Sequence, residues 1–173
     1  PVTGITFDSA SYCAVAFDLM NFNMPFFEIR TPGYPVFIAS IWLLSKSLYL
    51  VSFFQSLFTL FTVLFFLKVV NKYYRTVLIY FAIALTVYIT SSYFLLFETA
   101  LLTEGLFVNL LLLNSAFLII AFKKNTPADW ALFSALLAIT IIVRPAGLFL
   151  FSLVVLLTVL FLFKKINKKL IIH

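Results

Sequence analysis

The sequence predicts an all-α fold: a polytopic helical membrane protein with about five transmembrane helices and an interfacial helix after an outer loop. Hydrophobic residues make up 64% of the 173-residue chain and charged residues only 10%. A soluble domain carries about 25% charged residues, so this chain has too little polar surface to face water. Its apolar residues are grouped into segments of about 20, the length with which an α-helix crosses a hydrocarbon core of about 30 Å.

The N-terminal residues 1–34 are the most polar part of the chain, and we expect them to form an extracytoplasmic loop. At its end, Pro32-Gly33-Tyr34-Pro35 predicts a turn, because proline fixes φ and glycine accepts a left-handed conformation. The apolar residues that follow, up to Lys46, are too few to cross a membrane at about 1.5 Å per residue. Residues 35–46 are therefore predicted to form an interfacial or re-entrant helix.

The central part of the chain is predicted to hold three transmembrane helices. They are bounded by charged residues and cover residues 47–67, 76–97 and 101–122. The short segment after the third helix contains Pro127 and Asp129, and is predicted to be a loop.

The last apolar stretch, residues 130–163, can be interpreted in two ways. As one helix it would be about 50 Å long and would place Arg144 near mid-membrane. As two spans, 130–143 and 147–163, it would be interrupted at Arg144-Pro145, where proline removes a helix hydrogen bond. We adopt the second interpretation because it places every basic cluster, including a cytoplasmic tail at 164–173, on one side of the membrane.

With five spans, the charges divide sharply between the two sides. Of the six carboxylates only Asp129 falls on the basic side, together with nine of the twelve Lys and Arg residues. The other carboxylates are Asp8, Asp18, Glu28, Glu98 and Glu104. The positive-inside rule assigns the basic side to the cytoplasm, so we expect the chemistry on the extracytoplasmic side of the cytoplasmic membrane. The net charge of +6 thus reflects topology, and no nucleic-acid partner is expected.

Asp8 and Tyr12 are the first candidate functional residues. They are four residues apart and would share a face if the segment is helical. A carboxylate at the membrane–water boundary can act as a general base on a hydroxyl or amine. The alternative is that Asp8 is a solvated loop acid or a helix cap. The other three acids of this kind are expected to be solvated loop charges: Asp18, Glu28 and Asp129.

Arg30 precedes the predicted turn and Tyr34 lies within it, and the turn would deliver both to the start of the interfacial helix. The planar fork of arginine suits a phosphate group, such as that of a lipid carrier. The alternative is a tight loop in which Arg30 only extends its guanidinium towards water.

Glu104 and Arg144 are the remaining candidates. Glu104 stands near the start of the third span, where it either favours the helix dipole or lines a substrate cavity. Arg144 would lie about 21 Å along its span, and a buried arginine needs an acid or a phosphate as partner. The alternative is an interfacial arginine that reaches the membrane surface.

Taken in order, these motifs resemble the N-terminal half of the GT-C membrane glycosyltransferases. They are a loop aspartate with a tyrosine four residues on, Arg30-Thr31-Pro32-Gly33-Tyr34-Pro35, the start Thr103-Glu104-Gly105-Leu106-Phe107, and Val143-Arg144-Pro145-Ala146-Gly147-Leu148. The resemblance runs from Asp8 to about Leu148. The most similar branch contains the protein O-mannosyltransferases and the bacterial aminoarabinose transferase. The resemblance implies inverting transfer of a sugar from a polyprenyl-phosphate donor to a lipid, glycan or protein acceptor.

The resemblance also implies roles for individual residues. Asp8 would be the catalytic acid of the first outer loop and would deprotonate the acceptor. Glu104 would line the same cavity, with Tyr12 and Tyr34 as further substrate-binding residues. Arg30 and Arg144 would lie near the lipid phosphate and offset the charge of the leaving group.

The chain departs from the family in two respects. Many relatives have paired acids in the first loop, whereas this chain has Asp8-Ser9, so no metal site and no cofactor are expected. The family's first helix and its later helices are missing, so we expect a fragment that is inactive alone.

Two functions of other classes are compatible with the composition. A transporter or flippase of lipid-linked sugars would be favoured by the helix break at Arg144-Pro145, although no internal repeat is present. A non-catalytic membrane subunit is the other alternative, but such a role does not explain why the acids are clustered on one side of the membrane.

Overall fold

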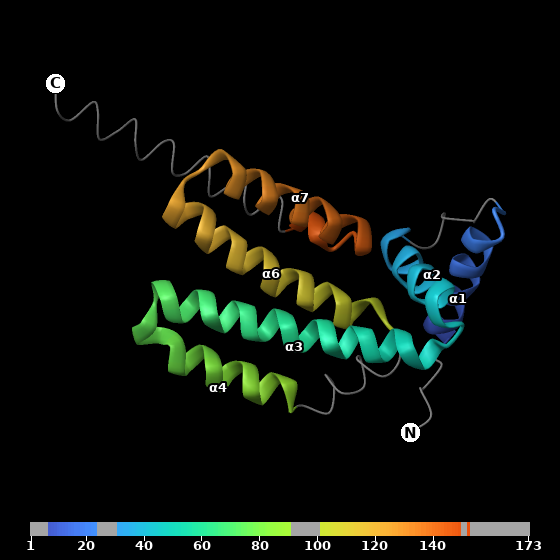
Figure 1. The fold of residues 1–173 in the computed structure, drawn as a ribbon, viewed down its shortest axis with the longest axis horizontal. Coiled ribbons are helices and arrows are strands. Elements are labelled where there is room, and N and C mark those ends of the chain that lie inside the picture. Colours follow the sequence, from blue (N-terminus) through green and yellow to red (C-terminus); the bar gives the residue numbers. More distant parts are fainter. Residues whose placement is uncertain (1–6, 24–30, 91–100, 150–151, 153–173) are drawn as a thin grey trace.

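The computed structural model describes residues 7–23, 31–90, 101–149 and 152, and within these ranges it contains helices and no strands (Figure 1). The all-α prediction is therefore confirmed. The helices are α1 (Phe7–Met20), α2 (Gly33–Ser45), α3 (Leu48–Tyr73), the 3-10 turn η1 (Arg75–Val77), α4 (Leu78–Ile89), α6 (Thr103–Lys124) and α7 (Pro127–Val143).

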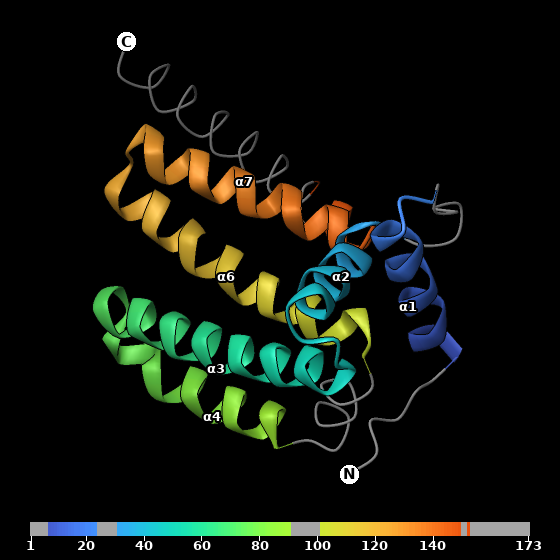
Figure 2. The same cartoon turned by 45° about the vertical axis from the view of Figure 1, so that its right-hand side comes forward.

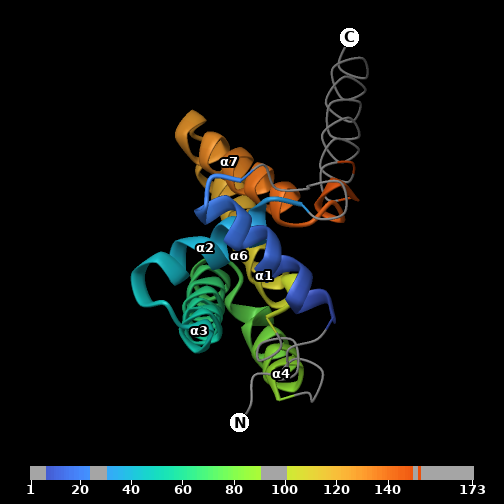
Figure 3. The same cartoon turned by 90° about the vertical axis from the view of Figure 1, so that its right-hand side faces the viewer.

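The longer helices form a row in which α6 is central. It packs against α3 on one side and α7 on the other, and α4 lies on the outer side of α3 (Figures 1 and 2). Helices α1 and α2 pack on each other and lie across one end of these long helices, where α2 contacts α3 and α7. Figure 3 shows the molecule from that end, along the axes of the long helices. The turn between α3 and α4 and the turn between α6 and α7 both lie at the opposite end.

Among the residues that the structure describes, two helices are long and apolar enough to cross a membrane, by length and composition: α3 with 26 residues and α6 with 22. Helix α3 continues past the predicted end at residue 67, through Lys68 and Lys72 to Tyr73. Basic residues are favourable in the last turns because they complement the helix dipole, so the first lysine did not mark the end of the helix. Of the predicted span 76–97, the part after residue 90 lies outside the described residues.

Helix α7 begins with a complete N-terminal cap. Pro127 occupies the first turn, and the Thr126 hydroxyl accepts a hydrogen bond from the Asp129 backbone N–H at 3.2 Å. The same hydroxyl donates to the Asp129 carboxylate at 2.6 Å, and Lys124 lies 3.6 Å from that carboxylate. The prediction that Asp129 is a solvated loop charge is wrong, because its side chain belongs to the cap and is only 16% exposed.

Asp18 also belongs to a helix, the last turn of α1, and is half-buried, so its prediction as a loop charge is wrong as well. Glu28, predicted with it, lies outside the described residues. Residues 1–34, predicted to form a loop, thus contain α1 and the first residues of α2.

The segment Pro32-Gly33-Tyr34-Pro35 is not a turn, contrary to the prediction, but the start of α2. Gly33 has no left-handed φ. It is required for close packing instead, because a Cβ atom at this position would lie 2.7 Å from the Val143 Cα atom. Beside it, the Thr31 hydroxyl donates to the Val143 carbonyl at 2.8 Å. These contacts fix the start of α2 on the end of α7.

Helix α7 ends at Val143, so residues 130–163 do not form one continuous helix. Arg144 has an extended backbone with φ −149° and ψ 128°. Helical structure resumes at Gly147, which packs so closely on α7 that a Cβ atom would lie 3.0 Å from the Ile141 Cα atom. The predicted break at Arg144-Pro145 is therefore present. The predicted span after it lies mostly outside the described residues, as does the basic tail 164–173.

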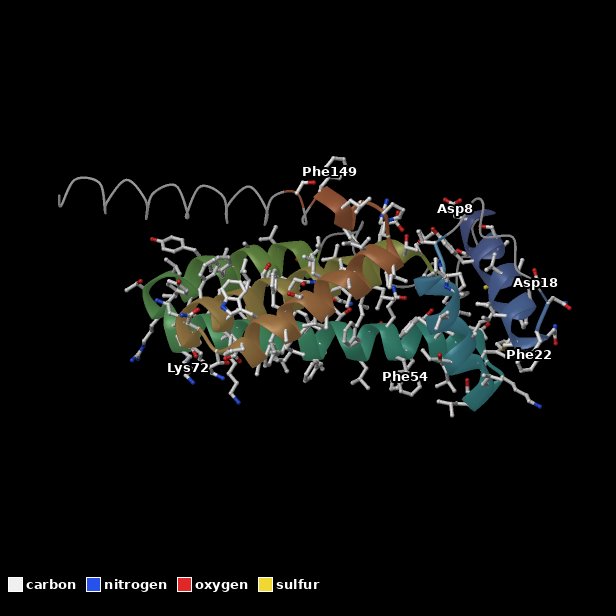
Figure 4. The ribbon with its side chains drawn as sticks, turned by 90° about the horizontal axis from the view of Figure 1, so that it is seen from above. Asp8, Asp18, Phe22, Phe54, Lys72 and Phe149 are labelled. Carbon is white, nitrogen blue, oxygen red and sulfur yellow. The ribbon has the colours of Figure 1, made fainter. Side chains whose placement is uncertain are left out.

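Most of the described carboxylates and most of the described cations lie at opposite ends of the long helices, which we call the acidic end and the basic end. Figure 4 shows Asp8 and Asp18 at the end covered by α1 and α2, and Lys72 at the other end. That other end also carries Lys68 near the end of α3, Arg75 in η1, and Lys123 and Lys124 in the last turn of α6.

We expect these two ends to face opposite sides of a membrane, which cysteine labelling tests. Ala10 and Ala128 are exposed at the acidic and basic ends respectively. Cys13 is buried, which raises the pKa of its thiol and slows its reaction, and Cys13→Ala removes it altogether. In that background, an impermeant maleimide should label Ala10→Cys in intact cells, and Ala128→Cys only after permeabilisation. Labelling of both positions from the same side would contradict this arrangement.

Candidate functional site

Glu104 and Arg144 are brought together at the acidic end by the antiparallel packing of α6 and α7. The start of α6 lies beside the end of α7, and the Arg144 Nη1 atom is 2.9 Å from the Glu104 Oε1 atom. The other carboxylate oxygen, Oε2, accepts a hydrogen bond from the Thr103 hydroxyl at 3.2 Å. The guanidinium also lies 5.7 Å from the centre of the Phe107 ring, within the range of a cation–π contact. Neighbouring side chains thus hold the pair in place.

This ion pair is accessible to a ligand. The Arg144 side chain is 36% exposed and the Glu104 side chain 31%. At such a boundary the attraction between the two charges is partly screened, so a phosphate could add to or replace the carboxylate as a partner of Arg144. The sequence left open whether this partner would be an acid or a phosphate, and the structure supplies the acid.

Tyr12 and Tyr34 form a second group, which is buried. Their rings pack edge to face with centroids 5.2 Å apart, and neither side chain is more than 8% exposed. The Tyr34 hydroxyl donates to the Gln55 Oε1 atom at 3.1 Å. These residues join α1, α2 and α3, so in this structure they support the acidic end from inside the protein rather than lining its surface.

Asp8 stands in the first turn of α1, where a carboxylate favours the helix dipole. Its side chain is exposed, whereas Tyr12, four residues on, is buried. Asp8 belongs to α1, which packs mainly on α2, whereas Glu104 belongs to α6 and Arg144 follows α7. Figure 4 shows Asp8 at the end of the molecule where α1 and α2 lie. Arg30, the other predicted phosphate ligand, lies outside the described residues.

A set of buried polar residues between the helices was not predicted from the sequence. The Asn109 amide of α6 donates to the Thr59 hydroxyl of α3 at 2.6 Å, and its oxygen accepts from Thr62 at 3.3 Å. On the other face of α6, the Asn114 amide donates to the Thr140 hydroxyl of α7 at 2.7 Å. The available signal was the spacing of Gln55, Thr59 and Thr62, which places them on one face of a helix.

An apolar groove of about 330 Å³ lies where α2, α3, α6 and α7 meet. Its lining residues are Gly33, Val36, Phe37, Phe58, Leu106, Leu110, Ile139 and Val143. Leu106 is two residues from Glu104, about 200° around the helix at 3.6 residues per turn. The groove and the ion pair therefore lie on different sides of α6.

The described part of the chain contains no group of three or more His, Cys, Asp or Glu side chains that could hold a metal ion. Comparison with family models, curated proteins and solved structures finds no match for this chain. Interpretation of the site therefore depends on its own geometry.

A double-mutant cycle of Glu104→Gln and Arg144→Gln tests whether the ion pair contributes to stability. Both side chains are about one-third exposed, so we expect a coupling free energy of about 0.5–1 kcal/mol that falls as salt is added. Unfolding in detergent, followed by circular dichroism, measures it. The Lys124–Asp129 pair provides the control: its atoms are 3.6 Å apart and its coupling should be smaller. A coupling near zero at low salt would contradict the expectation.

Proposed function

We propose that the chain is part of a GT-C-type membrane glycosyltransferase, which transfers a sugar from a polyprenyl-phosphate donor to a lipid, glycan or protein acceptor with inversion. The observation that carries this proposal is the accessible Glu104–Arg144 pair, 2.9 Å apart, at the acidic end of the helices. The helix break at Arg144-Pro145 and the Thr103-Glu104 helix start are two of the motifs on which the resemblance to this family depends.

In this proposal about five helices cross the cytoplasmic membrane, and the acidic end faces outwards. The two membrane-length helices, α3 and α6, and the separation of charges between the ends support this orientation. Helix α2 lies at the acidic end and exposes apolar side chains, including Leu43 at 69% and Leu44 at 83%. Such a helix is suited to lie in the membrane interface beside the site.

Arg144 would bind the phosphate of the donor. Its guanidinium presents several N–H donors in a plane that matches phosphate oxygens. Glu104 and Phe107 hold this group in place before the substrate arrives, so little reorganisation is needed when charge develops on the leaving phosphate. Glu104 would also contribute a carboxylate to the wall of the sugar site.

The reaction would be a direct displacement. The acceptor oxygen attacks the anomeric carbon while the bond from that carbon to the phosphate oxygen breaks, and polyprenyl phosphate leaves with the bonding electrons. Asp8 takes the proton from the acceptor hydroxyl. Attack opposite the leaving group inverts the configuration. The exposure of Asp8 at the acidic end supports its assignment as the base.

A transporter of lipid-linked sugars is the second candidate, because the chain breaks between α7 and the helical residues at Gly147, beside a charged pair. Helix breaks of this kind form binding sites in transporters. Such a protein would move the sugar lipid without cleaving it, so measurement of covalent transfer separates the two functions.

The test measures transfer from labelled polyprenyl-phosphate sugars in membranes that contain the natural full-length protein or its variants. Arg144→Gln should lower the rate by about 10²–10³-fold, the effect of removing one charge-stabilising donor. Arg144→Lys should recover only part of this rate, because an ammonium lacks the planar fork. Asp8→Asn should abolish transfer while leaving the amount of membrane-inserted protein unchanged.

Lys46→Gln is the control, because it removes one positive charge at the acidic end from an exposed residue outside the site. It should retain normal transfer. Wild-type rates for both Arg144→Gln and Asp8→Asn would exclude the proposed roles. Movement of sugar lipids across vesicles without any covalent transfer would favour the transporter.

A further inference from the structure

We propose that α3 carries a binding site for an anionic phospholipid of the membrane leaflet at the basic end. The site is a stripe along one side of the helix: Leu57, Phe61 and Leu64 would contact the acyl chains, and Lys68 and Lys72 the phosphodiester headgroup. This inference depends on insertion in a bilayer and not on the proposed glycosyl transfer.

The spacing of these residues places them on one side of α3. They follow one another at intervals of four, three, four and four residues, the intervals at which helical side chains are neighbours. The three apolar side chains are between 49% and 58% exposed, and both lysines are exposed. In Figure 4, Phe54 and Lys72 project from the same side of the molecule, as expected for residues five helical turns apart.

The dimensions of the stripe match one half of a bilayer. From Leu57 to Lys68 the helix rises by about 16 Å at 1.5 Å per residue. Half of a hydrocarbon core of about 30 Å is about 15 Å, so with Leu57 at mid-membrane the first lysine falls at the depth where phosphates begin. A phospholipid that lies along the helix would thus meet apolar side chains over its chains and cations at its headgroup.

Most of the positive charge at this end is not neutralised by carboxylates of the described part of the protein. Of its five described cations, only Lys124 pairs with a carboxylate, that of Asp129. Lys123 lies 4.7 Å from the centre of the Tyr74 ring, and Lys72 lies 5.3 Å from that of Tyr73. These rings hold the amines without removing their charge, and tyrosine is common at the membrane interface. Arg75 and Lys123 add to the field that attracts an anionic headgroup.

Helix-dipole complementation alone would also favour lysines in the last turns of α3, but it would not make one lipid accumulate there. Selective enrichment of an anionic phospholipid against this stripe is therefore the property to measure. Two cations in contact with the headgroup should each favour it by about five-fold over a zwitterionic lipid.

A single tryptophan can report which lipids lie beside the stripe. The chain has two tryptophans, Trp42 and Trp130, which Trp42→Phe and Trp130→Phe remove. In this background, the full chain carries Leu64→Trp in the stripe or, as a control, Leu132→Trp. Leu132 is 46% exposed on α7, which begins at the basic end beside the neutralised Lys124–Asp129 pair. The protein is reconstituted in phosphatidylcholine vesicles with a minor fraction of phosphatidylglycerol, and one of the two lipids has brominated chains that quench tryptophan.

At Leu64→Trp, brominated phosphatidylglycerol should quench far more than random mixing allows, and this excess should fall with added salt. At Leu132→Trp, quenching should follow the bulk composition. Lys68→Gln should reduce the enrichment about five-fold, and Lys68→Gln with Lys72→Gln should abolish it. Lys68→Arg with Lys72→Arg, and Lys46→Gln at the opposite end, should leave it unchanged.

Random mixing at Leu64→Trp would overturn the proposal, as would equal enrichment at both reporters. Enrichment that survives the double lysine variant would also overturn it. Soluble glycerol phosphate at constant ionic strength should not displace the lipid; if it did, the site would recognise a free phosphate ester instead. Absence of quenching by brominated phosphatidylcholine at both reporters would show that the helices are not in the bilayer, which would overturn it too.

Discussion

The structure depends on the hydrogen bonds with which α6 joins its two neighbours. Asn109 bonds to Thr59 of α3 at 2.6 Å, and Asn114 bonds to Thr140 of α7 at 2.7 Å. An amide in apolar surroundings is costly unless it finds a partner, so each asparagine restricts both the face of α6 that meets its neighbour and the height at which they meet. Apolar side chains of α6 such as Leu110 and Leu113 are also buried, but apolar contacts impose less restriction on register.

The register of α6 and α7 places the site. With Asn114 opposite Thr140, Glu104 lies beside Arg144, and the pair closes at 2.9 Å. The end of α7 then receives the start of α2 through Gly33 and Thr31, and Tyr34 continues the contact to Gln55 of α3. The acidic end is therefore built from segments far apart in sequence. They are held by a few polar contacts and by the close packing that Gly33 allows between α2 and α7. The basic end has a different character, because its described cations are exposed and only Lys124 among them pairs with a carboxylate.

Much of the fold could be predicted from the chain, because composition and segment length decide helix content and the proline at Arg144-Pro145 decides one break. The site could be predicted in part. Glu104 and Arg144 were both identified as candidate residues, and Arg144 as one that needs an acid or a phosphate as partner. Their contact is a tertiary one that sequence spacing cannot show. The turn expected at Gly33 was wrong because glycine permits two things, a left-handed φ and close packing, and only the structure distinguishes them. Asp129 was misjudged because a cap and a free loop acid have the same local composition. The burial of Tyr12 beside exposed Asp8 could not be derived, since the two lie one turn apart on the same side of α1 and only the structure shows that Tyr12 packs on Tyr34 of α2.

The most direct test concerns the amides of α6. Asn109→Leu and Asn114→Leu keep similar side-chain size but remove the hydrogen bonds between helices. Each should lower the free energy of unfolding in detergent by about 1 kcal/mol, as for interhelical hydrogen bonds in membrane proteins. Ser115→Leu is the matched control, because this exposed serine of α6 bonds only to the carbonyl of Leu111 in its own helix. If both asparagine variants unfold like the control, apolar packing alone sets the position of α6, and the hydrogen bonds of Asn109 and Asn114 do not determine the register on which the site depends.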